Sequence, residues 1–260
     1  MVDANGIRSI SRKAGAVALI VAAVQYVVLE AVAAAAWKDP RYSYSYNFIS
    51  DLGVPSCGGE VDGRTVCSPL HGVMNTGFVV EGVLFVVAAV LLFRMLPGRL
   101  RWVCLALVVV HGAGITLVGL VHGSPEAAAD GSMAWHILGA MMAIFAGNLV
   151  WIVVGRHLLR SGSGSGSGGS GGGGGSGRWL GITLIALGVF ALVCALLLQT
   201  VMNGNDTAAV FERGAVYPIM AAEFVVGVTL LRLRRSGTPI SAEPASADAG
   251  RSTITLGEQA

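Results

Sequence analysis

Five polar residues between positions 50 and 136 are of the types that hydrolytic sites use: Ser50, Asp51, His71, His122 and His136. The aspartate and the three histidines could hold a zinc ion that keeps one position open for water. The serine, next to a histidine and an acid, could instead act as a nucleophile. Because no HExxH-type spacing accompanies these residues, a hydrogen-bonded network that binds substrate or only stabilises loops is a third interpretation.

A second set of ionisable residues lies within apolar stretches of the chain: Glu30, Glu81, His111 and Glu223. His111 and His122 are separated by about three helical turns and therefore share a helix face. Ionisable groups are costly in an apolar environment, so they usually face a cavity or one another. We therefore expect one polar pocket, open at the end where the other histidines lie. Its expected lining is Asn75, Glu81, His111, Glu212, Arg213 and Glu223.

The elements that must position these residues are long apolar helices. Hydrophobic residues make up 54% of the 260 residues and charged residues 12%, with a mean hydropathy of +0.70. A soluble domain carries about a quarter charged residues, so lipid must be the solvent for much of this chain. The net charge of +2 is too small to suggest a nucleic-acid partner. Six apolar runs are long enough to cross roughly 30 Å of hydrocarbon as helices: Ala14–Ala36, Leu70–Phe93, Leu100–His122, Met133–Arg156, Trp179–Val201 and Gly214–Leu231.

The sequence therefore predicts an all-α integral membrane protein, a six-transmembrane-helix bundle in the lipid bilayer of the cell membrane. Most of the 17 Lys and Arg residues lie in the N-terminal segment 1–13, in two of the connections and after the last helix. The positive-inside rule places these segments, and hence both the N and C termini, in the cytoplasm. The membrane domain then covers residues 14–231, and the polar tail 232–260 is predicted to be disordered.

Two connections differ from the rest in composition. The predicted external loop 37–69 contains Cys57 and Cys67, which we expect to form a disulfide because such bonds persist outside the cytoplasm. The predicted cytoplasmic loop 161–177 is almost pure Gly and Ser, so we expect a flexible coil. This loop lacks the Lys-Ser/Thr pair of a phosphate-binding loop and suggests no nucleotide chemistry.

The segment Asn47–Gly53, which reads Asn-Phe-Ile-Ser-Asp-Leu-Gly, resembles the signature of an uncharacterised prokaryotic membrane family known as domain of unknown function 998. The resemblance covers roughly Ala14–Leu231 and implies six helices and an integral membrane location. It supplies no reaction. Four further segments resemble the family in the same order along the chain: His71–Phe78, Gly119–Gly123, Ala134–Gly139 and Phe211–Pro218.

Three hypotheses for the function remain open at this point. The first is a polar pocket, lined by His, Asp and Glu and facing outside, that binds or moves a small molecule or a lipid headgroup. A line of ionisable groups would suit proton-coupled transport, although the absence of inverted repeats and broken helices counts against a transporter. The second is a membrane-embedded hydrolase with about one zinc per chain at Asp51, His71, His122 and His136. The third is a structural or accessory protein in which Glu212 and Arg213 pair to hold the last helix.

The predicted topology can be tested with two single-cysteine variants, Asp130→Cys and Gly168→Cys. A thiol reagent that cannot cross membranes should label intact cells at position 130, because that loop is predicted to be external, and leave position 168 unlabelled. Labelling after cell lysis is the control that both cysteines can react. The opposite pattern in intact cells would invert the proposed orientation.

Overall fold

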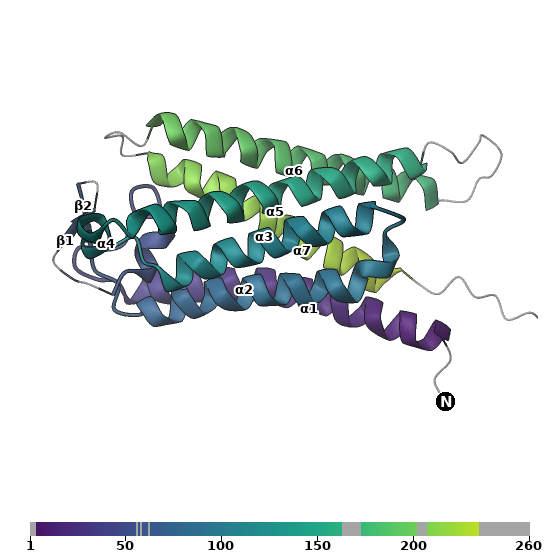
Figure 1. Ribbon diagram of the computed structural model, residues 1–260, viewed down its shortest axis with the longest axis horizontal. Coiled ribbons are helices and arrows are strands. Elements are labelled where there is room, and N and C mark those ends of the chain that lie inside the picture. Colours follow the sequence, from purple (N-terminus) through teal and green to yellow (C-terminus); the bar gives the residue numbers. More distant parts are fainter. Residues whose placement is uncertain are drawn as a thin grey trace, which may run out of the picture.

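The computed structural model of this chain describes residues 4–55, 57, 59–61, 63–162, 173–201 and 207–233. Six of its helices are long and apolar enough to cross a membrane, which confirms the prediction of an all-helical membrane bundle. They lie side by side along the long axis of the molecule (Figure 1). Their bounds are α1 Ala4–Ala36, α2 His71–Leu92, α3 Leu100–Leu120, α5 Met133–Gly162, α6 Gly173–Val201 and α7 Ala208–Arg232.

The six helices pack in the order of the sequence. Each contacts the next one along the chain, and α7 closes against α1 while also contacting α5. Glycines allow the closest approaches: a Cβ on Gly114 of α3 would lie 2.6 Å from the carbonyl oxygen of Gly139 on α5. One on Gly155 of α5 would lie 2.7 Å from the carbonyl oxygen of Gly181 on α6. Small residues serve this purpose in membranes because van der Waals packing, rather than hydrophobic burial, drives helix association there.

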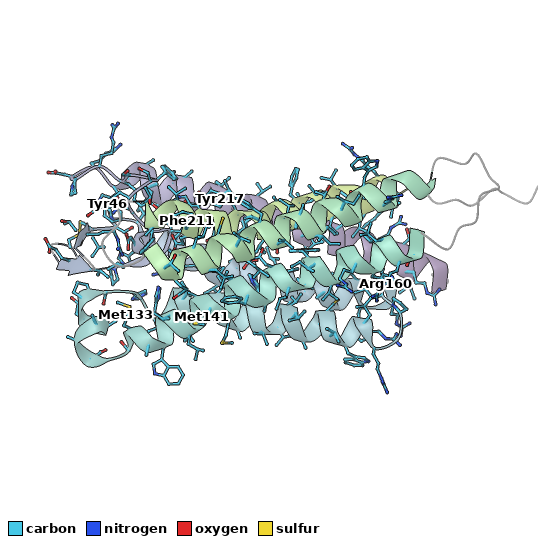
Figure 2. The ribbon with its side chains drawn as sticks, turned by 90° about the horizontal axis from the view of Figure 1, so that it is seen from above. Tyr46, Met133, Met141, Arg160, Phe211 and Tyr217 are labelled. Carbon is cyan, nitrogen blue, oxygen red and sulfur yellow. A yellow bond between two sulfur atoms is a disulfide. The ribbon has the colours of Figure 1, made fainter. Side chains whose placement is uncertain are left out.

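Short elements gather at one end of the bundle, which we call the loop end. They are the 3₁₀ helix η1 (Ser50–Gly53), the antiparallel hairpin of β1 (Gly59–Val61) and β2 (Arg64–Val66), and the short helix α4 (Pro125–Asp130). The predicted disulfide between Cys57 and Cys67 is present beside the hairpin. In Figure 2, Tyr46, Met133 and Phe211 mark the loop end, while Arg160 marks the opposite one.

The opposite end carries the start of α1, the end of α7 and the connection from α2 to α3, which includes the 3₁₀ helix η2 (Phe93–Met95) (Figure 1). We call it the basic end, because Arg94, Arg99, Arg101, Arg156 and Arg160 lie there. The start of α1 and the end of α7 therefore lie at the same end of the bundle, as predicted. That this side faces the cytoplasm stays a prediction.

Four helix boundaries lie six or more residues from those predicted, and one of them is the start of α7 at Ala208 rather than Gly214. α1 begins at Ala4 rather than Ala14, because its basic residues are good helix formers and can extend the helix beyond the hydrocarbon. The Gly/Ser segment predicted as a coil is helical at its margins, since α5 continues to Gly162 and α6 begins at Gly173. Residues 163–172 of that segment, and most of the predicted tail, lie outside the described residues.

The close contact between α3 and α5 predicts that one added methyl group lowers the stability of the bundle. Gly114→Ala should destabilise the bundle by about 1–3 kcal/mol, because its Cβ would overlap backbone atoms of α5 that cannot move aside locally. Thermal unfolding in detergent would measure the loss. The matched control is Gly72→Ala on α2, where a Cβ meets nothing within 4 Å. Equal melting temperatures for the two variants would contradict the proposed packing.

Candidate functional site

Three ionisable side chains meet at the centre of the bundle, each near the middle of its helix. Glu81 of α2, His111 of α3 and Glu223 of α7 are all fully buried. The Nε2 atom of His111 lies 3.0 Å from both carboxyl oxygens of Glu81, and its Nδ1 atom lies 2.7 Å from the carbonyl oxygen of Ala143 on α5. We call Glu81, His111 and Glu223 the central cluster.

The hydrogen bonds of His111 determine where its protons can be. A carbonyl oxygen only accepts, so Nδ1 carries a proton and donates it to Ala143. Nε2 therefore either donates to an ionised Glu81 or accepts from a protonated one. The His111–Glu81 contact thus contains one proton that can sit on either residue.

Glu223 adds a second carboxyl group to this contact. Its carboxyl group lies close enough to that of Glu81 to interact with it. Neither of its oxygens has a hydrogen bond of normal geometry to any described residue. Because net charge is costly in hydrocarbon, an uncharged cluster must hold two protons on Nε2 and the two carboxyl groups, in addition to the one on Nδ1. At least one of the two glutamates is then protonated.

A cavity connects the central cluster with the loop end. Its volume is ≈ 60 Å³, and its lining runs from Ser50 and Glu212 at the loop end to His111. The rest of the lining is mostly apolar, with Phe78, Val118 and Ile219 among its residues. Such a volume holds a few water molecules, each of which needs at least roughly 10–15 Å³ on this scale. His111 is therefore the member of the central cluster that lines this cavity.

Two aromatic rings lie on the other side of His111, towards the basic end. The ring of Phe85, one turn beyond Glu81 on α2, meets the imidazole edge to face with centroids 5.3 Å apart. The ring of Trp151 on α5 stacks on Phe85 with centroids 5.5 Å apart. Both residues are buried. This aromatic pair separates the central cluster from the basic end.

A buried ion pair joins α1, the first loop and α7 at the loop end. Arg213 of α7 lies 3.5 Å from Glu30 of α1 and donates to the carbonyl oxygen of Asn47 at 2.8 Å. It also donates to the hydroxyl of Tyr42, whose pKa is raised by burial. Tyr217 donates to the same Glu30 oxygen at 2.9 Å. The accessory-protein hypothesis paired Arg213 with Glu212, whereas the salt bridge in the structure joins Arg213 to Glu30, because α1 and α7 are neighbours in the bundle.

Glu212 and Asp51 are both bonded to the backbone of the first loop. The Glu212 carboxylate accepts from the backbone N–H of Ile49 at 2.5 Å. The Asp51 carboxylate accepts from the backbone N–H of Phe48 at 2.9 Å and from Nε of Arg64 at 3.2 Å. Arg64, on the hairpin strand β2, also lies over the ring of Phe48. These contacts hold the segment that carries Ser50 in place along the loop-end wall of the cavity.

Two of the three histidines of the predicted zinc site contact backbone carbonyl oxygens. His71 contacts the carbonyl oxygen of Ser68 at 3.1 Å, and His136 contacts that of Val121 at 2.7 Å. The pKa of His122, which follows α3, is lowered by burial and then by the nearby His71. Within the described part of the chain, no three His, Cys, Asp or Glu side chains are grouped so as to hold a metal ion. Asp51, the fourth predicted ligand, faces Arg64 instead.

The structure thus divides the residues predicted to line one pocket. His111 and Glu212 line the cavity, while Glu81 and Glu223 lie behind His111. Asn75 and Arg213 belong to the loop end, where Asn75 donates to the carbonyl oxygen of Gly53 at 2.8 Å. Sequence reasoning missed the roles of Glu30, Arg64, Phe85 and Trp151. A buried acid such as Glu30 was a usable signal, whereas the two aromatics resemble ordinary core residues.

Comparison with known proteins identifies the family to which the chain belongs. The family described as "Protein of unknown function (DUF998)" matches residues 11–229, which include all six long helices almost completely. The chain belongs to this family. No curated protein and no solved structure matches it. DUF998 membership confirms the resemblance seen in the sequence, and the assignment of an activity rests on the geometry of the site.

The ion pair at the loop end predicts a large loss of stability on breaking it. Arg213→Met should lower the free energy of unfolding by about 3–5 kcal/mol, because Glu30 would be left buried without its cation. The double variant Glu30→Gln/Arg213→Met should recover part of the loss. Arg232→Gln, at the exposed end of the same helix, is the matched control for thermal unfolding in detergent. A single variant as stable as this control would contradict the importance of the pair.

Proposed function

We propose that this protein binds a small molecule through the loop-end cavity and couples its entry to proton transfer at the central cluster. The observation that carries the proposal is the cavity itself, which joins the loop end to an imidazole that shares a proton with a buried carboxyl group. A bundle that binds no ligand would not need a cavity beside His111, and neither would a hydrogen bond with a purely structural role.

Charge balance favours a small cation as the molecule bound. The central cluster holds two carboxyl groups and one imidazole, and it is uncharged only while protons occupy it. A cation that approached the two glutamates would add a charge to this apolar region. Release of a proton would restore neutrality at little electrostatic cost, so binding of the cation and loss of the proton would be linked.

The size of the cavity limits what can enter. At ≈ 60 Å³ it is far smaller than the roughly 300–1,000 Å³ typical of drug-sized ligands. A small ammonium compound, or the ammonium part of a lipid headgroup, could enter after modest separation of the helices around it. Movement onward to the basic end would need Phe85 and Trp151 to part. The proposal therefore includes alternate opening of the two ends, with the loop end outside the cell membrane.

The other two hypotheses have different support. The hydrogen bonds that Arg213 and Asp51 make to the first loop favour a structural role for the loop-end residues themselves. The hydrolase hypothesis lacks a comparable observation in the described residues, because Asp51 is engaged by Arg64. A measurement of zinc in the purified protein and in a His71/His122/His136 triple alanine variant would reveal a metal that this proposal does not expect.

The coupling can be measured in proteoliposomes that contain a trapped pH-sensitive dye. Dilution into tetramethylammonium or choline, which cannot carry protons themselves, should make the lumen more alkaline as cations enter and protons leave. Glu81→Gln and Glu223→Gln should abolish this change, because each removes an ionisable carboxyl group while keeping its size. Glu60→Gln, on the exposed hairpin, is the matched control and should behave as the parent does.

Two results would contradict the proposal. One is an unchanged cation-dependent pH signal in both glutamate variants, which would place the proton elsewhere. The other is the absence of any signal from a panel of small cations and neutral solutes with protein that unfolds cooperatively on heating. Neither the panel nor the variants depend on knowing the natural ligand.

A further inference from the structure

A second cavity lies at the basic end, and its chemistry differs from that of the first. Its volume is ≈ 210 Å³, and its lining comes from η2 and all six long helices. Phe85, Val108 and Trp151 form part of its inner wall, whereas Met95, Arg101 and His157 lie nearer the basic end. Arg101 and His157 are the ionisable lining residues apart from the thiol of Cys104. An apolar interior with a cationic rim is the arrangement expected for an amphiphile.

We infer that this cavity binds the single chain of an anionic lipid, with its acidic headgroup at Arg101 and His157. The inference goes beyond the proposed function, because it concerns a separate cavity behind the Phe85–Trp151 pair. From Arg101 to Val108 the wall of α3 rises by about 10 Å, which gives room for part of an acyl chain. The volume is below that of typical drug-sized pockets, so one chain fits better than two.

The cationic rim is available to a headgroup. Nε of Arg101 donates to the carbonyl oxygen of Gly98 at 3.0 Å, and its guanidinium lies 5.4 Å from the centre of the Phe93 ring. These contacts hold the side chain at the rim. No carboxylate among the described residues pairs with Arg101 or His157. An acidic headgroup would supply the missing counter-charge through charge-assisted hydrogen bonds.

The size and charge of the cavity point to the kind of lipid. A phospholipid with one acyl chain matches a volume that holds one chain, and its phosphate carries the negative charge that faces the rim. The class proposed is therefore an anionic lysophospholipid, and lauroyl lysophosphatidylglycerol is a suitable probe.

Native mass spectrometry of the protein in an uncharged detergent would count the lipids that remain bound. Lauroyl lysophosphatidylglycerol should bind about ten-fold more tightly than the zwitterionic choline analogue, because both carry the phosphate but Arg101 would repel the choline cation. The double variant Arg101→Gln/His157→Gln should lose this preference. Arg99→Gln is the matched control, because Arg99 is exposed next to the same helix start and does not line the cavity. Ala89→Phe should block binding by filling the cavity.

The lining residue Cys104 provides a second measurement. Cys104 and Cys194 are the free cysteines, so in a Cys194→Ala background N-ethylmaleimide reports on Cys104 alone. The anionic probe should slow its labelling in the parent and not in Ala89→Phe. Equal lipid binding by the parent, the double variant and Ala89→Phe would show attachment to the outer surface only and would overturn the inference. So would the absence of both bound lipid and protection in the folded parent.

Discussion

The hydrocarbon that surrounds the middle of the bundle is the constraint on which the rest of the structure depends. A polar group there can only be satisfied by another part of the protein, since lipid tails offer neither donors nor acceptors. His111 meets this requirement with two partners from different helices, the Glu81 carboxyl group and the Ala143 carbonyl oxygen. It therefore ties α2, α3 and α5 together at the level where a hydrogen bond is hardest to replace.

The glycines of the helix interfaces make this convergence achievable. Close contact of α3 with α5 at Gly114 and Gly139 brings their backbones together about one turn from His111. Gly147 has a similar effect, because a Cβ there would lie 2.5 Å from Nδ1 of His111. Larger residues would hold the helices apart, and the cluster would then need water or an added side chain to complete its bonds. Packing and polar chemistry are thus coupled at the same helix faces.

The two ends of the bundle use their polar residues differently. At the loop end, Arg213 pairs with Glu30, and both Arg213 and Asp51 form hydrogen bonds with the backbone of the first loop. These contacts stabilise the fold of the loop end. At the basic end, Arg101 and His157 lie at the rim of an apolar cavity with no carboxylate partner among the described residues. Between them the Phe85–Trp151 pair separates a small, partly polar cavity from a larger apolar one. This arrangement gives the molecule two chemically distinct sites along one axis.

Several features could be anticipated from single residues. The meeting of Glu81, His111 and Glu223 was predictable because each is an ionisable residue near the middle of an apolar helix, where only similar residues can satisfy it. No three of the four predicted zinc ligands are grouped so as to hold a metal ion in the described residues: Arg64 of the hairpin binds the Asp51 carboxylate, and backbone carbonyls contact His71 and His136. The contacts of His71 and His136 could not be read from the sequence, because a backbone carbonyl is present at every position.

The sequence by itself determined that the chain forms six apolar helices, that the start of the first and the end of the last lie at the same end of the bundle, and that Cys57 and Cys67 pair. These properties follow from composition, segment length and the count of crossings, which do not depend on how the helices are arranged. Only the tertiary structure decided that Arg213 pairs with Glu30 and that the interior contains two cavities separated by Phe85 and Trp151. Those outcomes depend on which helix faces meet, and helices that are apolar all round carry too little periodicity to specify that in advance.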